Sequence, residues 1–275
     1  MADPRLEAAG VSVRFGDFTA LDRVDWRIDH PGVIGLIGLN GAGKTTLIRA
    51  VLGLQPVTAG AVRVPIGLGA VGYCPDTPGF EPWLSAREVL EQSMAIGPVR
   101  RTGRATIDTA LAAVDLERHA HRRAGGFSRG MLQRLGIAAA LVRDPEVLIL
   151  DEPTSALDPE GRAAVLALIR ELGGRMTVVF SSHLLADVED LADRLLVLHR
   201  GRAIFTSDTA EFRAGHAAEP TLRIALTSGR IIEAAPERWE TVLAEVSARS
   251  AEIDDIRIDR PSLTDAFFTA IGEKP

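Results

Sequence analysis

Lysine is nearly missing from this sequence of 275 residues. The 31 basic residues comprise 29 arginines and only two lysines, Lys44 and Lys274. Lys274 is the penultimate residue, so we expect the folded body to contain a single lysine. Because arginine supplies positive charge everywhere else, Lys44 is the first residue whose presence needs an explanation.

Cysteine is scarce as well, and the 37 acidic residues outnumber the 31 basic ones. The single Cys74 excludes an intramolecular disulfide and a cysteine-based zinc site, and it favours a reducing compartment. A net charge of -6 argues against non-specific nucleic-acid binding, which needs a basic face. No apolar run approaches the ~20 residues that span a bilayer. Residues 1–5 lack the basic-then-apolar order of a signal peptide. We therefore expect a cytoplasmic protein that reaches a membrane only through a partner.

The composition that remains, 46% hydrophobic and 25% charged, is that of a globular protein. Short β-rich runs alternate with helical patterns, which predicts an α/β fold with a mostly parallel sheet. The runs at 33–37, 147–150 and 178–180 are apolar throughout, as in parallel strands buried on both faces.

Two stretches depart from this alternation. From about residue 85 to residue 143 only helical patterns occur, which predicts a helical insertion between two strands. After residue 208 the pattern becomes a hairpin, a helix, a strand and a final helix. We therefore predict a main domain over residues 1–208 and a small α+β domain over residues 209–275.

Residues 38–45 read Gly-Leu-Asn-Gly-Ala-Gly-Lys-Thr and fit the P-loop pattern G-x-x-x-x-G-K-[ST] between an apolar run and a helical pattern. In a P-loop, backbone N–H groups at a helix N-terminus bind phosphates, the lysine lies between two phosphates, and the hydroxyl binds magnesium. A compact ammonium suits this place better than the planar guanidinium of arginine, which explains the one body lysine. A glycine-rich turn that caps an ordinary helix is the alternative. The predicted phosphate-binding residues are Gly38, Asn40, Gly41, Ala42, Gly43, Lys44, Thr45 and Thr46.

The apolar run 147–150 ends in two carboxylates, Asp151 and Glu152. A strand that simply exits into solvent would also end in charged residues, but a P-loop in the same chain favours a Walker B motif. Asp151 is then placed to hold magnesium through water, and Glu152 is the natural general base for an attacking water.

About twenty residues before Asp151, the chain reads Phe127-Ser128-Arg129-Gly130-Met131. This segment resembles the signature of ABC transporter ATPases, which is usually Leu-Ser-Gly-Gly-Gln. Ser128 and Gly130 match that pattern, whereas Arg129 and Met131 differ from it. Ser128 is also a good N-cap for a helix whose free N–H groups meet a γ-phosphate from outside, and a plain N-cap is the alternative.

The resemblance extends through most of residues 5–205. His183 matches the switch histidine of the family, and Phe15 matches the aromatic residue that stacks on adenine. Residues 155–158 match the D-loop. Asp76 replaces the usual glutamine of the Q-loop, from which it could reach magnesium. A core phenylalanine and a structural histidine are the alternatives for Phe15 and His183.

The resemblance implies an ABC cassette of the P-loop NTPase fold, with a RecA-like core sheet, N-terminal antiparallel strands and the helical insertion. It implies hydrolysis of ATP with Mg²⁺, in which Lys44, Glu152 and His183 are catalytic. It also implies a head-to-tail dimer, with itself or a related ATPase subunit, in which Ser128 and Gly130 act in trans. A separate transmembrane permease would hold the protein at the inner face of the membrane, and no nucleic acid is expected.

The C-terminal segment 262–268 resembles the end of exporter ATPases of the drug- and lipid-export branch, although an amphipathic terminal helix is the alternative. The arginine-rich runs 100–104 and 118–123 are either solvated surfaces or contacts to a permease or anionic lipid. Two other functions stay open, a soluble ABC-type protein of DNA repair or translation and a cassette that binds ATP without hydrolysing it.

Overall fold

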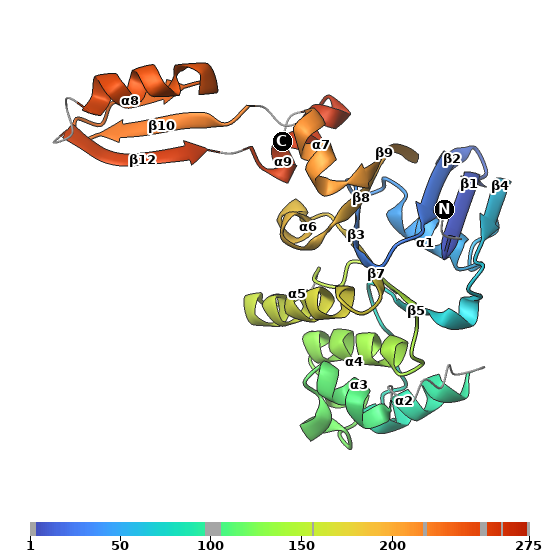
Figure 1. Cartoon of the computed structure of the whole chain (residues 1–275). Coiled ribbons are helices and arrows are strands. Elements are labelled where there is room, and N and C mark those ends of the chain that lie inside the picture. The colour runs from blue at the N-terminus through green and yellow to red at the C-terminus, as the bar shows by residue number, and fades with distance from the viewer. Residues whose placement is uncertain are drawn as a thin grey trace. The chain divides into compact units, whose positions relative to one another are not determined.

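The computed structural model describes residues 4–96, 106–155, 157–216, 219–247, 252–259 and 261–273. The chain divides into two compact units, Met1–Thr209 and Ala210–Pro275 (Figure 1). Lys274, the arginine-rich run at 100–104 and Ala156 of the predicted D-loop lie outside the described residues. Within the described ranges, no helix is both long and apolar enough to cross a membrane.

The core of the first unit is a six-stranded sheet in the order β5-β6-β7-β3-β8-β9. All of its pairings are parallel except that between β8 and β9. This confirms the predicted mostly parallel sheet. Its strands are β3 (Gly32–Ile37), β5 (Val71–Cys74), β6 (Val147–Leu150), β7 (Thr177–Ser182), β8 (Arg194–His199) and β9 (Arg202–Asp208).

β9 is the strand that the sequence pattern does not predict. It lies at the edge of the sheet, and its residues alternate between exposed and half-buried. An edge strand of this kind carries no continuous apolar run, so the signal that marks the buried β6 and β7 is missing.

A second, antiparallel sheet in the order β2-β1-β4 covers one face of the core. It consists of β1 (Leu6–Phe15), β2 (Phe18–Ile28) and β4 (Ala59–Arg63). Helix α1 (Lys44–Val51) packs between the two sheets, because its buried side chains join one apolar cluster with residues of both. The helix that follows the P-loop is thereby fixed on two sides.

The opposite face of the core sheet is covered by α4 (Arg129–Leu141), α5 (Pro159–Gly173) and α6 (Leu185–Leu191) (Figure 1). The helical insertion contains α2 (Ala86–Ala95), α3 (Ile107–Ala113) and α4, with short turns η2 (Glu117–His119) and η3 (Ala124–Gly126). Each of its three helices begins at a side-chain N-cap.

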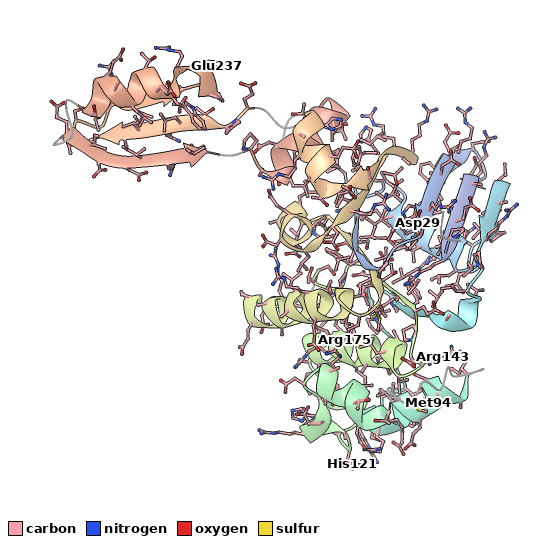
Figure 2. The ribbon with its side chains drawn as sticks, viewed as in Figure 1. Asp29, Met94, His121, Arg143, Arg175 and Glu237 are labelled. Atoms are coloured by element: carbon pink, nitrogen blue, oxygen red, sulfur yellow. The ribbon has the colours of Figure 1, made fainter. Side chains whose placement is uncertain are left out.

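Side chains fill the spaces between the helices and the sheets of this unit (Figure 2). Figure 2 labels His121 at the outer end of the insertion, where it is exposed to solvent. A further turn, η1 (Leu68–Ala70), leads into β5. The described residues of the predicted insertion between β5 and β6 therefore contain helices and turns, and no strand longer than the isolated bridge of Ser85 with Arg123.

The second unit holds a three-stranded antiparallel sheet in the order β11-β10-β12, with an apolar core of its own. The sequence pattern predicts every element of it except helix α7. The elements from the junction onward are α7 (Thr209–His216), β10 (Thr221–Leu226), β11 (Ile231–Ala234), η4 (Pro236–Arg238), α8 (Trp239–Ser247), β12 (Ile253–Asp259) and α9 (Leu263–Ile271).

Candidate nucleotide-binding site

The P-loop lies between the end of β3 and the start of α1, at the carboxyl edge of the parallel sheet. Gly43 precedes the helix with a φ of 105°, in the region that only glycine adopts readily. A Cβ atom at Gly43 would lie 2.8 Å from the Ala20 carbonyl oxygen, and one at Gly38 would lie 2.4 Å from that of Leu198. Close backbone packing therefore requires glycine at both positions, and at Gly43 the backbone conformation requires it as well.

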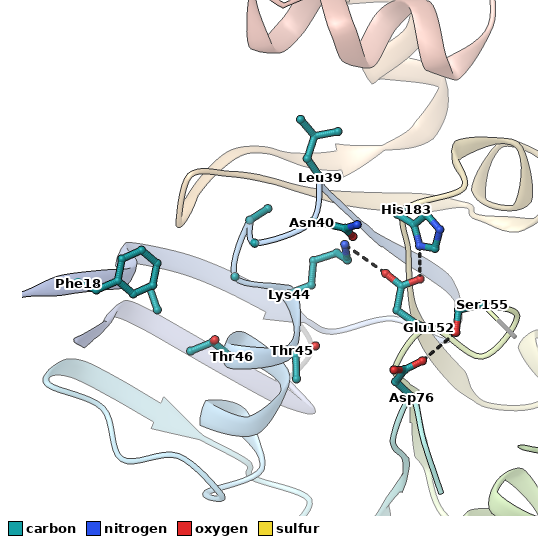
Figure 3. A pocket seen from close by; sticks show the side chains of 14 residues that line it. Phe18, Leu39, Asn40, Lys44, Thr45, Thr46, Asp76, Glu152, Ser155 and His183 are labelled. Carbon is teal, nitrogen blue, oxygen red and sulfur yellow. Dashed lines mark hydrogen bonds and ion pairs between the residues drawn. The ribbon is translucent and has the colours of Figure 1, made fainter. Parts of the chain in front are cut away.

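A cavity of about 400 Å³ opens above this loop (Figure 3). Most of the predicted phosphate-binding residues line it, and so do predicted residues from three other segments. The lining consists of Phe18, Ala20, Leu39, Asn40, Gly41, Ala42, Gly43, Lys44, Thr45, Thr46, Asp76, Glu152, Ser155 and His183. Apart from the signature residues, three predicted site residues are not part of this lining: Gly38 and Asp151, which are buried, and Phe15.

Three predicted catalytic side chains contact one another in this cavity. Lys44 is 7% exposed, and its Nζ donates a hydrogen bond to the Gly38 carbonyl oxygen at 2.8 Å. The same Nζ lies 3.2 Å from Glu152 Oε1. Glu152 Oε2 is hydrogen-bonded to His183 Nδ1 at 2.7 Å (Figure 3). One carboxylate thus bridges the cation of the P-loop and the imidazole at the end of β7.

The backbone at the end of β6 directs the two carboxylates apart. Asp151 is 1% exposed, and its Oδ1 accepts a hydrogen bond from Ser181 Oγ at 2.6 Å. Ser181 Oγ also accepts from the Glu152 N–H at 2.8 Å. Glu152 has a φ of 48°, an uncommon conformation for a non-glycine residue. This left-handed backbone conformation directs the Glu152 side chain into the cavity, whereas Asp151 remains buried outside the lining.

Asp76 and Ser155 meet at the side of the cavity. Ser155 Oγ donates a hydrogen bond to Asp76 Oδ1 at 2.8 Å, although the two residues are 79 positions apart (Figure 3). The residue at the Q-loop position is thereby joined to the first residue of the predicted D-loop within one chain. Nothing in the sequence indicates this contact.

The aromatic residue that lines the cavity is Phe18. Phe15 and Phe18 flank a two-residue turn at Gly16-Asp17 and lie directly opposite each other in the β1–β2 hairpin. Both are exposed, Phe15 by 50% and Phe18 by 64%. The Gly-Asp turn between two phenylalanines is a signal in the sequence that places Phe18 beside Phe15.

The signature residues do not line the cavity of their own chain. Ser128 is exposed and N-caps α4, where its Oγ accepts a hydrogen bond from the Met131 N–H at 3.3 Å. Gly130 lies in the first turn of that helix, where a Cβ would approach Leu157 Cδ2 to 3.3 Å. In one chain these residues therefore form a capped helix end outside the lining of the P-loop cavity.

Cys74 is fully buried at the end of β5. Its Sγ accepts a hydrogen bond from Gln133 Nε2 of α4 at 3.7 Å. Burial, and to a lesser degree the nearby Asp151 and Asp76 carboxylates, raise the pKa of the thiol to about 12. The thiol is therefore protonated at neutral pH, and Cys74 packs as a small apolar residue.

Residues 21–155 match the family model described as ABC transporter. The daunorubicin resistance ATP-binding protein DrrA3 of Streptomyces coeruleorubidus is 32% identical over 311 aligned positions, which cover 99% of this chain and 98% of that protein. This chain belongs to the ABC transporter ATP-binding proteins. ATP binding and ATP hydrolysis for transport are the activities of that family, and its ATP-binding subunits dimerise and pair with transmembrane permease components.

Other relatives of this ABC transporter ATP-binding protein match a shorter part of it. The aliphatic sulfonates import ATP-binding protein SsuB 2 of Frankia alni is 40% identical over 204 residues, 74% of this chain and 80% of that protein. A solved structure of the ATP-binding subunit of an ABC transporter superposes with a TM-score of 0.69 at 29% identity, covering 76% of this chain and 92% of that chain. The ABC cassette fold is thereby confirmed.

Proposed function

We propose that the P-loop cavity binds the triphosphate of ATP and that Lys44 exchanges partners when it does so. The observation that carries this proposal is the contact of Lys44 Nζ with Glu152 Oε1 at 3.2 Å. A γ-phosphate that enters beside Lys44 replaces the carboxylate as its partner, because both are oxygen anions that seek the same ammonium. The exchange leaves Glu152 free to accept a proton.

Glu152 then acts as the general base. It takes a proton from the water that attacks the γ-phosphorus, the bond from that phosphorus to the bridging oxygen breaks, and ADP and phosphate leave. His183, which contacts Glu152 at 2.7 Å, holds the carboxylate in place and lies beside the γ-phosphate. Lys44 and the P-loop N–H groups stabilise the negative charge on the phosphate oxygens.

The oxygen ligands around this cavity fit Mg²⁺, a hard cation that binds few carboxylates and keeps several waters. Thr45 would bind it directly, and the buried Asp151 would do so through water. Asp76 supplies a further carboxylate at the cavity wall, although its bond from Ser155 engages one oxygen. When bound, the ion neutralises charge on the β- and γ-phosphates.

The adenine is proposed to stack on the β1–β2 hairpin. Phe15 occupies the family's place for this contact, and Phe18 adds a second exposed ring that lines the cavity. Exposed aromatic rings that pack against no core are well suited to a flat base.

A second subunit, a copy of this chain or a related one, is proposed to complete each site. The support is the placement of Ser128 and Gly130 outside their own chain's cavity. In a head-to-tail dimer the capped N-terminus of α4 would meet the γ-phosphate bound to the partner's P-loop, with its N–H groups facing the anion. Closure of the dimer on ATP and its opening after hydrolysis would drive the permease.

We propose that this protein belongs to the export branch and serves export rather than import. The relative named for daunorubicin resistance matches along nearly the whole chain, whereas the sulfonate importer matches a length comparable with the first unit alone. The segment from Ser262, which N-caps α9, completes that similarity. We place the protein in the cytoplasm, peripheral to the inner face of the membrane through its permease. Residues 1–208 would be the ATPase domain and 209–275 the accessory domain.

The replacement Lys44→Arg tests the phosphate site. The variant keeps the charge but puts a planar fork where the side chain is 7% exposed, so ATP affinity should fall by at least about tenfold. Titration calorimetry with ATP measures this, and Arg175→Lys, at an exposed position remote from the cavity, is the matched control. Unchanged ATP affinity in Lys44→Arg would contradict the proposed site.

A further inference from the structure

The open edge of the C-terminal sheet carries apolar side chains that stay half-exposed among the described residues of this unit. In β12, Ile256 and Ile258 pair with Ile224 and Leu222 of β10 across the sheet, so they lie on the face that holds the unit's core. Ile224 and Leu222 are buried, yet Ile256 is 46% exposed and Ile258 is 45% exposed. The apolar face therefore continues to the edge of the sheet.

The backbone of β12 also has hydrogen-bonding groups directed outward. The Leu226 N–H donates to the Arg230 carbonyl in the hairpin, and the Thr227 N–H donates to that of Glu252. In an antiparallel sheet the backbone N–H and C=O groups of successive residues are directed to the two neighbouring strands in turn. The even-numbered residues of β10 therefore direct these groups toward β11, and the odd-numbered residues direct them toward β12. The register then directs the backbone groups of Ile256 and Ile258 away from β10.

The charges on β12 distinguish between the ways in which a second copy could pair with this edge. Antiparallel pairing about a two-fold axis at Ile256 places Asp255 of each chain opposite Arg257 of the other. Pairing about Arg257 would instead oppose two arginines. Pairing about Ile258 would oppose Arg257 to Asp259, which already lie 3.0 Å apart within one chain, and it would give Asp255 no cation across the interface. Among the described residues Asp255 has no ion-pair partner, so pairing at Ile256 gives it one.

We propose that β12 is an interaction surface for a second copy of this chain, paired antiparallel about Ile256. The contact joins two three-stranded sheets into one of six, brings Ile256 against its own counterpart and forms two Asp255–Arg257 pairs. A contact of this kind is isologous, as a two-fold dimer requires. It is distinct from the ATP sites, and it raises the effective concentration of one ATPase unit beside the other when no nucleotide is bound.

Charge exchange tests the register. Sedimentation equilibrium of the full chain without nucleotide should show a dimer whose dissociation constant rises roughly tenfold in Asp255→Arg and in Arg257→Asp, because each variant opposes like charges twice. The double variant should return to within a few-fold of wild type. Wild-type chain that stays monomeric at the highest concentration tested would overturn the proposal, and so would a double variant no tighter than its single parents.

A cysteine at the axis gives a second test. Hydrogen-bonded antiparallel partners have Cα atoms about 5.5 Å apart, a separation that a disulfide can bridge. Because Cys74 is buried, Ile256→Cys creates the one exposed thiol among the described residues. Mild oxidation should link Ile256→Cys into dimers and leave Glu233→Cys, at an exposed position on β11, largely monomeric. Equal linking of the two variants would contradict pairing through β12.

Discussion

The P-loop and the signature segment of the ATPase unit differ in how much of a binding site each forms within one chain. Around the P-loop, Lys44, Glu152 and His183 from three separate segments contact one another beside a cavity. At the signature, Ser128 is exposed, and its described hydrogen bond is to the N-terminus of its own helix. The difference teaches that one chain assembles the P-loop part of a site from its own segments, whereas its signature residues lie outside that cavity.

Removing the proposed general base should have the largest effect at the P-loop cavity. We expect Glu152→Gln to lose at least about a hundredfold in turnover, because an amide cannot accept the proton of the attacking water. ATP binding should persist or strengthen, since Lys44 no longer has a competing carboxylate. Phosphate release and ATP titration measure the two effects. Glu160→Gln, at an exposed position on α5, is the control; wild-type turnover in Glu152→Gln would rule out the assigned base.

Phe18 in the β1–β2 hairpin tests which part of the ATP affinity comes from a contact with adenine. Phe18→Ala should weaken ATP binding roughly tenfold, within the range of about 1–3 kcal/mol for one base stacked on one ring. Its affinity for inorganic tripolyphosphate should not change, and Phe18→Trp should restore ATP binding. A parallel loss of affinity for tripolyphosphate would show that Phe18 supports the fold of the loop rather than contacting adenine.

A smaller effect is expected from the charge at the Q-loop position. Asp76→Asn removes a negative charge from the cavity wall and keeps an oxygen that can accept from Ser155, so ATP affinity without magnesium should rise a few-fold. Ser155→Ala removes the hydrogen bond but keeps the charge, and it should not raise that affinity. A gain in Ser155→Ala equal to that in Asp76→Asn would mean that the contact, and not the charge, opposes ATP.

The last expected effect is on stability rather than on ATP binding, and it concerns Cys74, which lies where the signature helix α4 packs on the strand that leads to Asp76. Its thiol pKa of about 12 in the folded chain is above the ordinary value, so burial of the neutral thiol stabilises the fold fully below about pH 8.5. That contribution is lost as the pH rises toward 12. The unfolding free energy of wild type should therefore fall relative to Cys74→Ala between pH 8.5 and 11. A difference that stays constant over this interval would contradict the burial.

Much of the ATPase unit and of its candidate site could be predicted from the sequence. The P-loop and the run that ends in Asp151 and Glu152 carry dense local signals, because the phosphate loop and the buried strand each restrict consecutive residues. β9 could not be predicted from an apolar run, because an edge strand does not need one. The contact of Asp76 with Ser155 depends on how distant loops meet, which no local pattern encodes, whereas Phe18 could have been found from its turn.

The central claim is that the exposed Ser128 of one chain completes the P-loop site of another. Ser128→Asp is suited to test it, because aspartate also caps a helix while its carboxylate repels a γ-phosphate. Thr106→Asp makes the same change at the N-cap of α3 and should retain full turnover.

The most direct measurement mixes two inactive chains, Lys44→Ala and Ser128→Asp, and follows phosphate release. Each variant alone spoils both sites of its homodimer. In a mixed dimer the intact P-loop of one chain meets the intact signature of the other, so an equal mixture should recover about a quarter of wild-type turnover. A mixture no more active than its two components would contradict a site that is shared between chains.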